Sequence, residues 1–324
     1  MFDKIITVTP SPCLDVSLWV DTPYCEFGAP NSEPAVVNRE HTDAGGKGVN
    51  VSRVLTNLGI RNLSLSITGD INLPTFTDIL DNECVEYDCV EYSGSIRENF
   101  TITLSDGKVM KIDRKGDTIG KKEILALKEN VLRNITNAKD TLVHFGGSLP
   151  NGMDKGDYIA LIKNIASTGT KVSIDSAILT IEDYLHIRPY MIKPNLAELS
   201  IASGRGISSI NDVVNAVCPL RGVVTHILVS MGDKGLYYAS EGSNSIAIPP
   251  TIRAISTVGA GDTTVAGFIY ALASEQGIDD AVRFAAACGT ASVLLEGTKA
   301  ITHKMAEDML DRIKLKKIEE DMVL

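Results

Sequence analysis

The chain has 324 residues, which is long enough for one large α/β domain or two small ones. Hydrophobic residues make up 44% and charged residues 22%, a composition typical of globular proteins. Its 31 basic and 41 acidic residues give a formal net charge of −10, and the basic run Lys314-Leu315-Lys316-Lys317 is short. This balance argues against a surface for nucleic acid or anionic membrane, but a few cations in a cleft can still bind an anionic small substrate. No apolar run approaches the roughly 18 residues of a membrane-spanning helix. The N-terminal residues lack the pattern of a signal peptide, so we expect a cytoplasmic protein.

The cysteines and histidines do not indicate a metal site. The cysteines form no Cys-x-x-Cys pair, and the histidines show no ligand spacing. We therefore expect free thiols rather than disulfides or zinc ligands. The cysteines are Cys13, Cys25, Cys84, Cys89, Cys218 and Cys288.

The first third of the chain is rich in short alternating or apolar runs, which predict strands. The predicted strands cover residues 5–9, 16–20, 63–68, 100–104 and 109–113. Ser105-Asp106-Gly107 lies between the last two strands and predicts a hairpin turn. The segments near residues 16–44 and 93–113 are interpreted as a small second sheet inserted into the main domain.

From about residue 120, helical and strand patterns alternate, which predicts a mostly parallel sheet covered by helices on both faces. In such sheets ligands bind at the carboxyl ends of the strands, where glycine-rich turns open into helices. The predicted helices cover residues 121–137, 154–167, 210–217, 263–275 and 279–295. The predicted strands cover residues 142–145, 172–175, 191–192 and 227–230.

The segment Gly259-Ala260-Gly261-Asp262 opens one of these helices. Glycines let the backbone N–H groups turn toward one point, and a helix N-terminus adds partial positive charge there, so the segment predicts a cradle for a phosphate. A carboxylate beside a bound phosphate is repelled by it, and its natural use is to accept a proton from an attacking hydroxyl. The alternative is that Asp262 is an ordinary N-cap and the glycines form a tight turn.

A second glycine-rich segment, Gly45-Gly46-Lys47-Gly48-Val49-Asn50, also opens a helix, and Gly59 is predicted to end it. Lys47 and Asn50 are candidates to bind sugar hydroxyls or an anion, and the alternative is a surface turn. The chain contains no Walker A sequence. A dinucleotide-binding reading rests on Asp279 as a ribose ligand, but Thr264 stands where that fingerprint requires Gly or Ala.

Together the two segments resemble the two signatures of the ribokinase-like (PfkB) carbohydrate kinases, in the same order along the chain. Further matches are Thr9-Pro10-Ser11-Pro12-Cys13-Leu14-Asp15, Gly146-Gly147-Ser148-Leu149-Pro150, Lys193-Pro194-Asn195-Leu196-Ala197-Glu198 and Ser230-Met231-Gly232-Asp233-Lys234-Gly235. The first two are most similar to the phosphosugar branch, which contains 1-phosphofructokinase, tagatose-6-phosphate kinase and the minor 6-phosphofructokinase. Ser256 and Thr101 depart from the pattern, since they stand where the family has Asp and where 1-phosphofructokinases commonly have Lys.

The resemblance implies a role for each matching residue. Asp262 would be the catalytic base, and Gly259, Ala260 and Gly261 would form the anion hole for the transferring phosphoryl group. Arg97 would bind the phosphate that the sugar already carries, and Glu198 would contact Mg²⁺ through water. The sugar-binding residues would be Asp15, Gly46, Lys47, Asn50, Arg97 and Ser148. The ATP-binding residues would be Asn195, Glu198, Ser230, Gly232 and Gly235.

The implied fold is α/β and ribokinase-like, with residues 1–324 forming one kinase domain and the inserted sheet acting as a lid. The implied activity is transfer of the γ-phosphoryl group of ATP, with Mg²⁺, to tagatose-6-phosphate, fructose-1-phosphate or fructose-6-phosphate. The partners would be ATP, a sugar phosphate and a second copy of the chain bound through the lid. A non-catalytic sugar-phosphate-binding or regulatory protein on the same fold, and a dehydrogenase, are the alternatives.

Overall fold

In the computed structural model, which describes residues 2–23 and 34–318, neighbouring residues of the central strands are buried on opposite faces of one sheet. Ile5 and Leu142 pack against the helices of one face, whereas Ile6 and Val143 pack against those of the other. Because strand side chains alternate, a sheet covered on both faces requires continuous apolar runs. This explains why the strand signals along the chain are apolar rather than alternating.

Within the described residues the central sheet has ten strands, in the order β14-β13-β12-β11-β10-β9-β8-β1-β4-β5. Neighbouring strands from β5 to β11 run parallel, and β12, β13 and β14 continue the sheet antiparallel. The predicted mostly parallel sheet is confirmed, although its antiparallel edge was not predicted. The strands are β1 (Lys4–Thr9), β4 (Leu63–Gly69), β5 (Glu86–Tyr92), β8 (Thr141–Gly146), β9 (Lys171–Asp175), β10 (Met191–Ile192), β11 (His226–Ser230), β12 (Leu236–Ala239), β13 (Asn244–Ile248) and β14 (Lys314–Lys317).

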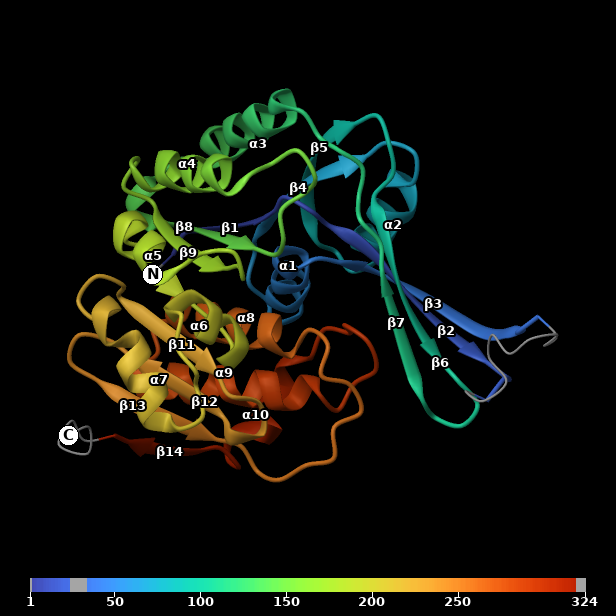
Figure 1. Ribbon diagram of the computed structural model, residues 1–324. Helices are drawn as coiled ribbons and strands as arrows, with labels where there is room; N and C mark the ends of the chain where they lie inside the picture. Colours follow the sequence, from blue (N-terminus) through green and yellow to red (C-terminus); the bar gives the residue numbers. More distant parts are fainter. Residues whose placement is uncertain (1, 24–33, 319–324) are drawn as a thin grey trace.

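Helices cover both faces of this sheet (Figure 1). One layer contains α1 (Lys47–Asn57), α8 (Ala260–Ala273), α9 (Ile278–Ser292) and α10 (His303–Leu310). The other contains α3 (Lys121–Asn134), α4 (Lys155–Ala166), α5 (Ile181–Ile187), α6 (Leu196–Ser203) and α7 (Ile210–Val217). A further helix, α2 (Leu73–Asn82), packs in a separate cluster with Leu14 and Ile96. In the described parts of the chain no helix has the length and apolar character needed to cross a membrane.

A second sheet of four strands, in the order β3-β2-β6-β7, extends away from the body of the molecule (Figure 1). Its strands are β2 (Cys13–Val20), β3 (Val37–Gly45), β6 (Arg97–Thr103) and β7 (Val109–Asp113). The small inserted sheet is therefore confirmed, together with its hairpin, in which Gly107 has a φ of 80°. Residues 24–33 of the predicted segment 16–44, including Cys25, lie outside the described residues.

Several predicted boundaries were wrong by a few residues. The helix predicted over 121–137 ends at Asn134 because Ile135 adopts an extended conformation. The helix predicted over 279–295 ends at Ser292, where Leu294 and Leu295 close tighter turns. The strand predicted over 100–104 begins at Arg97, because Arg97 pairs in parallel with Cys13 of β2.

The base of the small sheet is fixed to the body by a buried arginine. Arg53 of α1 is 1% exposed and forms a bidentate ion pair with Glu83, at 2.5 Å for each bond. Arg53 Nη2, one of the two nitrogens that bind Glu83, also donates to Asp43 at 3.0 Å. Its Nη1 donates to the Ala44 carbonyl of β3 at 3.0 Å and to Thr298 at 3.2 Å. The buried charge is thus fully paired, which is the condition under which burial of a charge is tolerated. It holds the end of β3 just before the Gly45-Gly46 turn.

Candidate active site

The turn before α8 places a carboxyl group at a helix N-terminus. Gly259 is the N-cap and has a φ of 76°, a left-handed conformation that favours glycine. Asp262 lies in the first helical turn and is 7% exposed. Interpreting Asp262 as an N-cap was therefore wrong. The side chain is free to face the groups across the site instead of capping its own helix.

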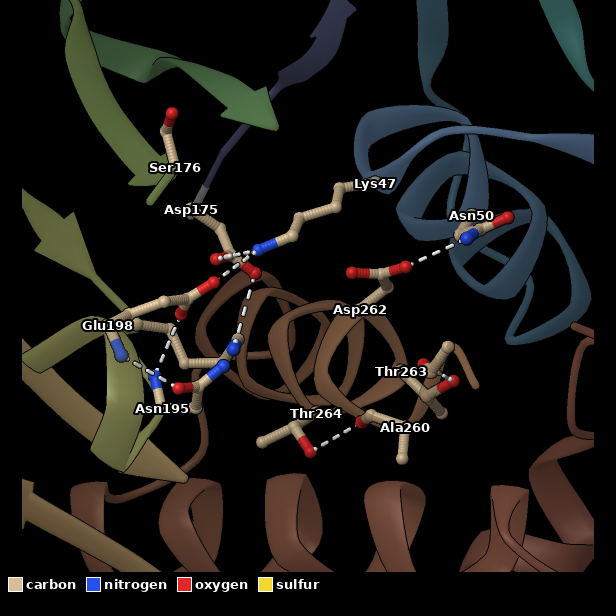
Figure 2. Close-up of polar contacts among 12 residues, drawn as sticks. Lys47, Asn50, Asp175, Ser176, Asn195, Glu198, Ala260, Asp262, Thr263 and Thr264 are labelled. Carbon is tan, nitrogen blue, oxygen red and sulfur yellow. Dashed lines mark hydrogen bonds and ion pairs between the residues drawn. The ribbon is translucent and has the colours of Figure 1, made fainter. Parts of the chain in front are cut away.

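Asp262 is joined to the first glycine-rich segment by a hydrogen bond. Asn50 Nδ2 donates to Asp262 Oδ2 at 2.7 Å, and Figure 2 shows the two side chains facing each other. Burial, and next the negative charge of Asp175, raise the pKa of Asp262 to about 7, while the Asn50 bond, Lys47 and Lys193 act in the opposite direction. A carboxyl group with a pKa near neutrality is well suited to exchange a proton at physiological pH.

Lys47 and the carboxylates of Asp175 and Glu198 lie together beside Asp262 (Figure 2), and Lys193 completes this network. Lys47 Nζ lies 2.8 Å from Asp175 Oδ1 and 3.0 Å from Glu198 Oε1. Lys193 Nζ lies 3.2 Å from Asp175 Oδ2, and both of these side chains are almost fully buried. Burial by itself would raise the pKa of Asp175, but Lys193 and Lys47 outweigh it and hold this pKa below its ordinary value. Asp175 is therefore ionised, and its charge disfavours ionisation of Asp262.

The Asn195–Glu198 pair forms a capping box at the start of α6. Asn195 Oδ1 accepts from the Glu198 N–H at 2.9 Å, and Glu198 Oε2 accepts from the Asn195 N–H at 2.8 Å. The second oxygen of Glu198 faces Lys47, so this carboxylate is turned into the site rather than to solvent. Within residues 2–23 and 34–318, no cluster of three or more Asp, Glu, His or Cys side chains is placed to hold a metal ion by itself. An ion bound here would need ligands from water or a bound phosphate in addition to Glu198, as Mg²⁺ commonly has.

These groups line a cavity of about 690 Å³, a size that suits a nucleotide. The walls include all five residues predicted to bind ATP and all four residues of the Gly259-Ala260-Gly261-Asp262 turn. Ala286 and Gly289 of α9 also line the cavity, and Gly289 packs against Ala260 and Thr264 of α8. Ser230 Oγ is buried at the end of β11 and has no hydrogen-bond partner among the described residues. Small side chains and an unpaired hydroxyl are consistent with a wall that contacts a flat, polar ligand.

The predicted sugar-binding residues lie at the base of the small sheet, and of these only Lys47 also lines that cavity. Asp15 of β2 accepts hydrogen bonds from Asn99 Nδ2 at 3.1 Å and from Cys13 Sγ at 3.3 Å. Burial raises its pKa, while those two bonds lower it. A methyl group placed on Gly45 would come within 2.2 Å of Asp15 Oδ2, so the glycine-rich turn packs directly against this carboxylate.

Arg97 and the loop that carries Ser148 both contact Gly116. Arg97 Nη2 donates to the Ser11 carbonyl at 3.4 Å, and the methylene groups of Arg97 lie against Gly116. Asn151, in the loop that carries the exposed Ser148, donates to the Gly116 carbonyl at 2.6 Å. Gly116 therefore brings the Ser148 loop and Arg97 together. The structure thus brings the predicted residues into two adjoining groups, the ATP-binding residues along the cavity and the sugar-binding residues at the base of the small sheet. Lys47, Asn50 and Asp262 lie between the two groups.

Two residues of the site were missed by reasoning from the sequence. Asp175 ends strand β9 and Lys193 follows strand β10, so both stand at carboxyl ends of parallel strands. That position was itself a usable signal, because ligands collect at this edge of an α/β sheet. A methyl group on Gly261 would lie 3.1 Å from Lys193 Nζ, which places this cation directly beneath the predicted anion hole.

Comparison with known proteins supports one family. Residues 21–305 match the pfkB family of carbohydrate kinases. A 1-phosphofructokinase of Vibrio cholerae is 30% identical over 298 residues, which cover 92% of this chain and 92% of the relative. A tagatose-6-phosphate kinase of Staphylococcus epidermidis is 26% identical over 315 residues, covering 96% and 99%. The crystal structure of phosphofructokinase-2 from Escherichia coli with substrates and products has a TM-score of 0.86 and 25% identity, over 95% of this chain and 98% of that one.

Proposed function

The chain belongs to the pfkB family of carbohydrate kinases, and on this basis we propose that it transfers the γ-phosphoryl group of ATP to a hydroxyl of a ketohexose monophosphate. Its relatives are kinases, so the chain is a phosphotransferase that acts on an alcohol group of a sugar phosphate. The names of those relatives suggest three candidate substrates: fructose 1-phosphate, fructose 6-phosphate and tagatose 6-phosphate.

The observation that carries the proposal is the buried Asp262 carboxyl, whose pKa is raised to about 7 at the N-terminus of α8. In its ionised form Asp262 would accept the proton of the attacking sugar hydroxyl. Backbone N–H groups of Gly259, Ala260 and Gly261, with Lys193 beneath them, would stabilise the charge on the transferring phosphoryl group. A binding protein without catalysis would have no use for a proton acceptor beside a phosphate.

We place ATP in the cavity of about 690 Å³, along Asn195, Glu198, Ser230, Gly232 and Gly235. Glu198 suits the outer coordination of Mg²⁺, because one of its oxygens faces the site and the ion keeps most of its water. Bound there with ATP, the ion would neutralise phosphate charge. Lys47 contacts both Glu198, on the ATP side of the site, and Asp175, and it is positioned to move toward a bound phosphate.

The sugar would lie between the base of the small sheet and α1, against Asp15, Gly46, Lys47 and Asn50. Arg97 and Ser148 would bind the phosphate it already carries, since a guanidinium matches phosphate geometry. In this arrangement the small sheet acts as a lid on a single kinase domain of residues 1–324. A closed lid excludes water, which limits hydrolysis of ATP.

On the face of the lid that points away from Asp15, strands β2, β6 and β7 carry an apolar stripe, which supports a homodimer. Strand pairing places Val16, Phe100 and Ile112 in one row of this face, and Leu18, Ile102 and Met110 in the next. Ile112 is 46% exposed. An apolar stripe of this kind is suited to burial against a second copy of itself. Phosphofructokinase-2 from Escherichia coli has a tetrameric inhibited form, so at least one protein with this fold forms oligomers.

The test of the proposed function is ADP release with Mg²⁺ and ATP, measured in parallel on the three candidate sugar phosphates. The proposal expects one of them to be turned over faster than the others. If a protein that still binds ATP released no ADP with any of the three sugar phosphates, the proposal would be contradicted. A non-catalytic sugar-phosphate-binding protein would then be favoured.

A further inference from the structure

Arg39 joins the outer part of the lid to the body of the molecule. It lies on β3, and its Nη2 donates at 2.8 Å to Glu296 Oε2, in the loop between α9 and α10. Strand pairing places Arg39 across from Trp19 of β2. Trp19 and Asp15 are four residues apart on the same strand, so alternation puts them on one face. The bond to Glu296 therefore starts from the site face of the lid.

The guanidinium of Arg39 is also stacked on an aromatic ring. Its Cζ lies 3.7 Å from the centre of the Trp19 ring, which is a cation–π contact. Both side chains line a cavity of about 280 Å³, and the other wall of this cavity includes Glu296 and Lys299 of the body. Trp19 is thus half-buried between the lid and the body, and an outward movement of the lid would expose its ring.

The loop that carries Glu296 is fixed to the body. Thr298 is buried, and its hydroxyl accepts from Arg53 Nη1 at 3.2 Å. A methyl group on Gly259 would lie 3.6 Å from Thr298 Cγ2, so the loop also packs against the turn before α8. Glu296 is therefore a firm attachment point for a side chain that reaches it from the lid.

The same loop contacts the lid in a second row, at its base. A methyl group on Gly297 would lie 3.3 Å from Asp43 Oδ2, and Asp43 is paired with the buried Arg53. Asp43 and Arg39 are four residues apart on β3, which corresponds to about 13 Å. The base is held by buried charges, whereas the side chains of Arg39 and Glu296 are 54% and 48% exposed. An exposed ion pair is weak, so the outer row can open while the base stays fixed.

Glu296 has a second cation close by for the time when Arg39 leaves. Lys299 Nζ lies 3.7 Å from Oε2, the same oxygen that accepts from Arg39. The bond from Arg39 holds the pKa of Glu296 below its ordinary value, so the pair is charged at neutral pH. With the lid open, Glu296 keeps Lys299 as a partner and Arg39 keeps the Trp19 ring. Neither arrangement leaves an unpaired buried charge, and this allows both to be populated.

We propose that Arg39 and Glu296 form a latch that closes the lid onto the body, with Trp19 holding Arg39 in position. The latch acts through the position of the lid rather than on the sugar itself. Its effect on the bound sugar rests on the proposed function, because the closed lid covers the proposed sugar site. A closed latch would then retain the sugar phosphate.

Trp19 is the only tryptophan of the chain, so quenching of its fluorescence by acrylamide measures how far the lid is open. The measurement uses the full chain without ligands. Glu296→Gln removes the charge, keeps the shape of the side chain and leaves Arg39 next to Trp19. It is expected to raise the quenching constant by about twofold.

The matched control is Glu86→Gln, which weakens the exposed pair that Glu86 forms with Arg61 at 2.9 Å in the body. It should leave the quenching constant unchanged. Equal quenching of the wild type and Glu296→Gln would overturn the latch. An equal rise in Glu86→Gln would overturn it as well, because the effect would then not depend on the lid.

Calorimetric binding of fructose 1-phosphate, fructose 6-phosphate and tagatose 6-phosphate tests the effect of the latch on the sugar. Glu296→Gln and Arg39→Met are each expected to weaken binding of the preferred sugar phosphate by about two- to fivefold, with the dissociation constant for ATP unchanged. The double variant should bind no more weakly than Arg39→Met, because Glu296 acts through Arg39.

Losses that multiply in the double variant would overturn the latch and leave the proposed function intact. A wild-type protein that binds none of the three sugar phosphates would contradict the proposed function. In that case the quenching of Trp19 still decides whether Arg39 and Glu296 hold the lid.

Discussion

Asn50 donates a 2.7 Å hydrogen bond to Asp262, and this bond joins segments that lie 212 residues apart in the chain. Asn50 stands in the first turn of α1 and Asp262 in the first turn of α8, so the two helix N-termini meet at the same point. The amide orients the carboxylate and favours its ionised form. The proposed base is therefore positioned by the segment that is also proposed to bind the sugar.

The rate should depend on the ionisation of Asp262. Its pKa is raised to about 7, so the carboxyl group is protonated, and inactive as a base, below that pH. We expect kcat/KM to be flat above pH 8 and to fall by about tenfold per pH unit below pH 6. A pH profile of kcat/KM for the sugar phosphate checks this. A profile that stays flat down to pH 5 would show that no group with this pKa is needed.

Replacement of Asn50 should move the acidic limb of the pH profile, which is the range of pH in which kcat/KM falls. The Asn50 bond lowers the pKa of Asp262, so Asn50→Ala is expected to raise it and to shift the limb to higher pH. Asn57→Ala is the control, because Asn57 lies at the end of the same helix and donates a long bond, of 3.4 Å, to the Ala300 carbonyl. A limb that moves to lower pH in Asn50→Ala, or moves equally in both variants, would contradict this role.

A side chain at Gly46 should disturb the sugar side of the site. Gly46 has a φ of 114°, and an added methyl group would come within 2.7 Å of Thr9 Cγ2 and 3.2 Å of Pro12 Cα. Gly46→Ala is expected to lower the free energy of unfolding by about 1–3 kcal/mol and to raise the KM for the sugar more than the KM for ATP. Gly206→Ala, at a glycine with open space around it, should be nearly neutral in urea denaturation. Equal stability of the two variants would argue against the turn as described.

The apolar face of the lid should control assembly. Ile112→Glu places a charge on that face, so we expect sedimentation velocity to show a dimer for the wild type and a monomer for the variant. Val109→Glu is the matched control, since Val109 is 55% exposed and alternation places it on the site face of the same strand. A wild-type monomer, or dissociation by Val109→Glu alone, would exclude the proposed interface.

The strongest local patterns were enough to predict most of the fold. The helix over 210–217 and the strand over 191–192 were correct to the residue, because caps or short apolar runs define them. Edge strands were harder to predict from the sequence. Strand β5 is half-buried and carries Glu86, Asp88 and Glu91, so its sequence contains no apolar run. Strands β12 to β14 add to the sheet antiparallel, and no local signal fixes that order.

The residues of the glycine-rich turns could be predicted from the sequence. The site residues that only the order of the strands brings together could not. The glycine-rich turns required their backbone geometry, so Gly46 and Gly259 could be found from composition and spacing. Asp175 and Lys193 end or follow ordinary apolar strands, and only the order of strands in the sheet brings them to Lys47 and Gly261.

The central claim is that Asp262 is the base in phosphoryl transfer, and Asp262→Asn tests it most directly. The measurement is the rate of bisphosphate formation at pH 8 with saturating Mg²⁺, ATP and the preferred sugar phosphate. We predict that kcat falls by about 10³- to 10⁴-fold, while the dissociation constants for ATP and the sugar phosphate change only a few-fold. A variant that keeps kcat within tenfold of the wild type would contradict the assignment of Asp262 as the base.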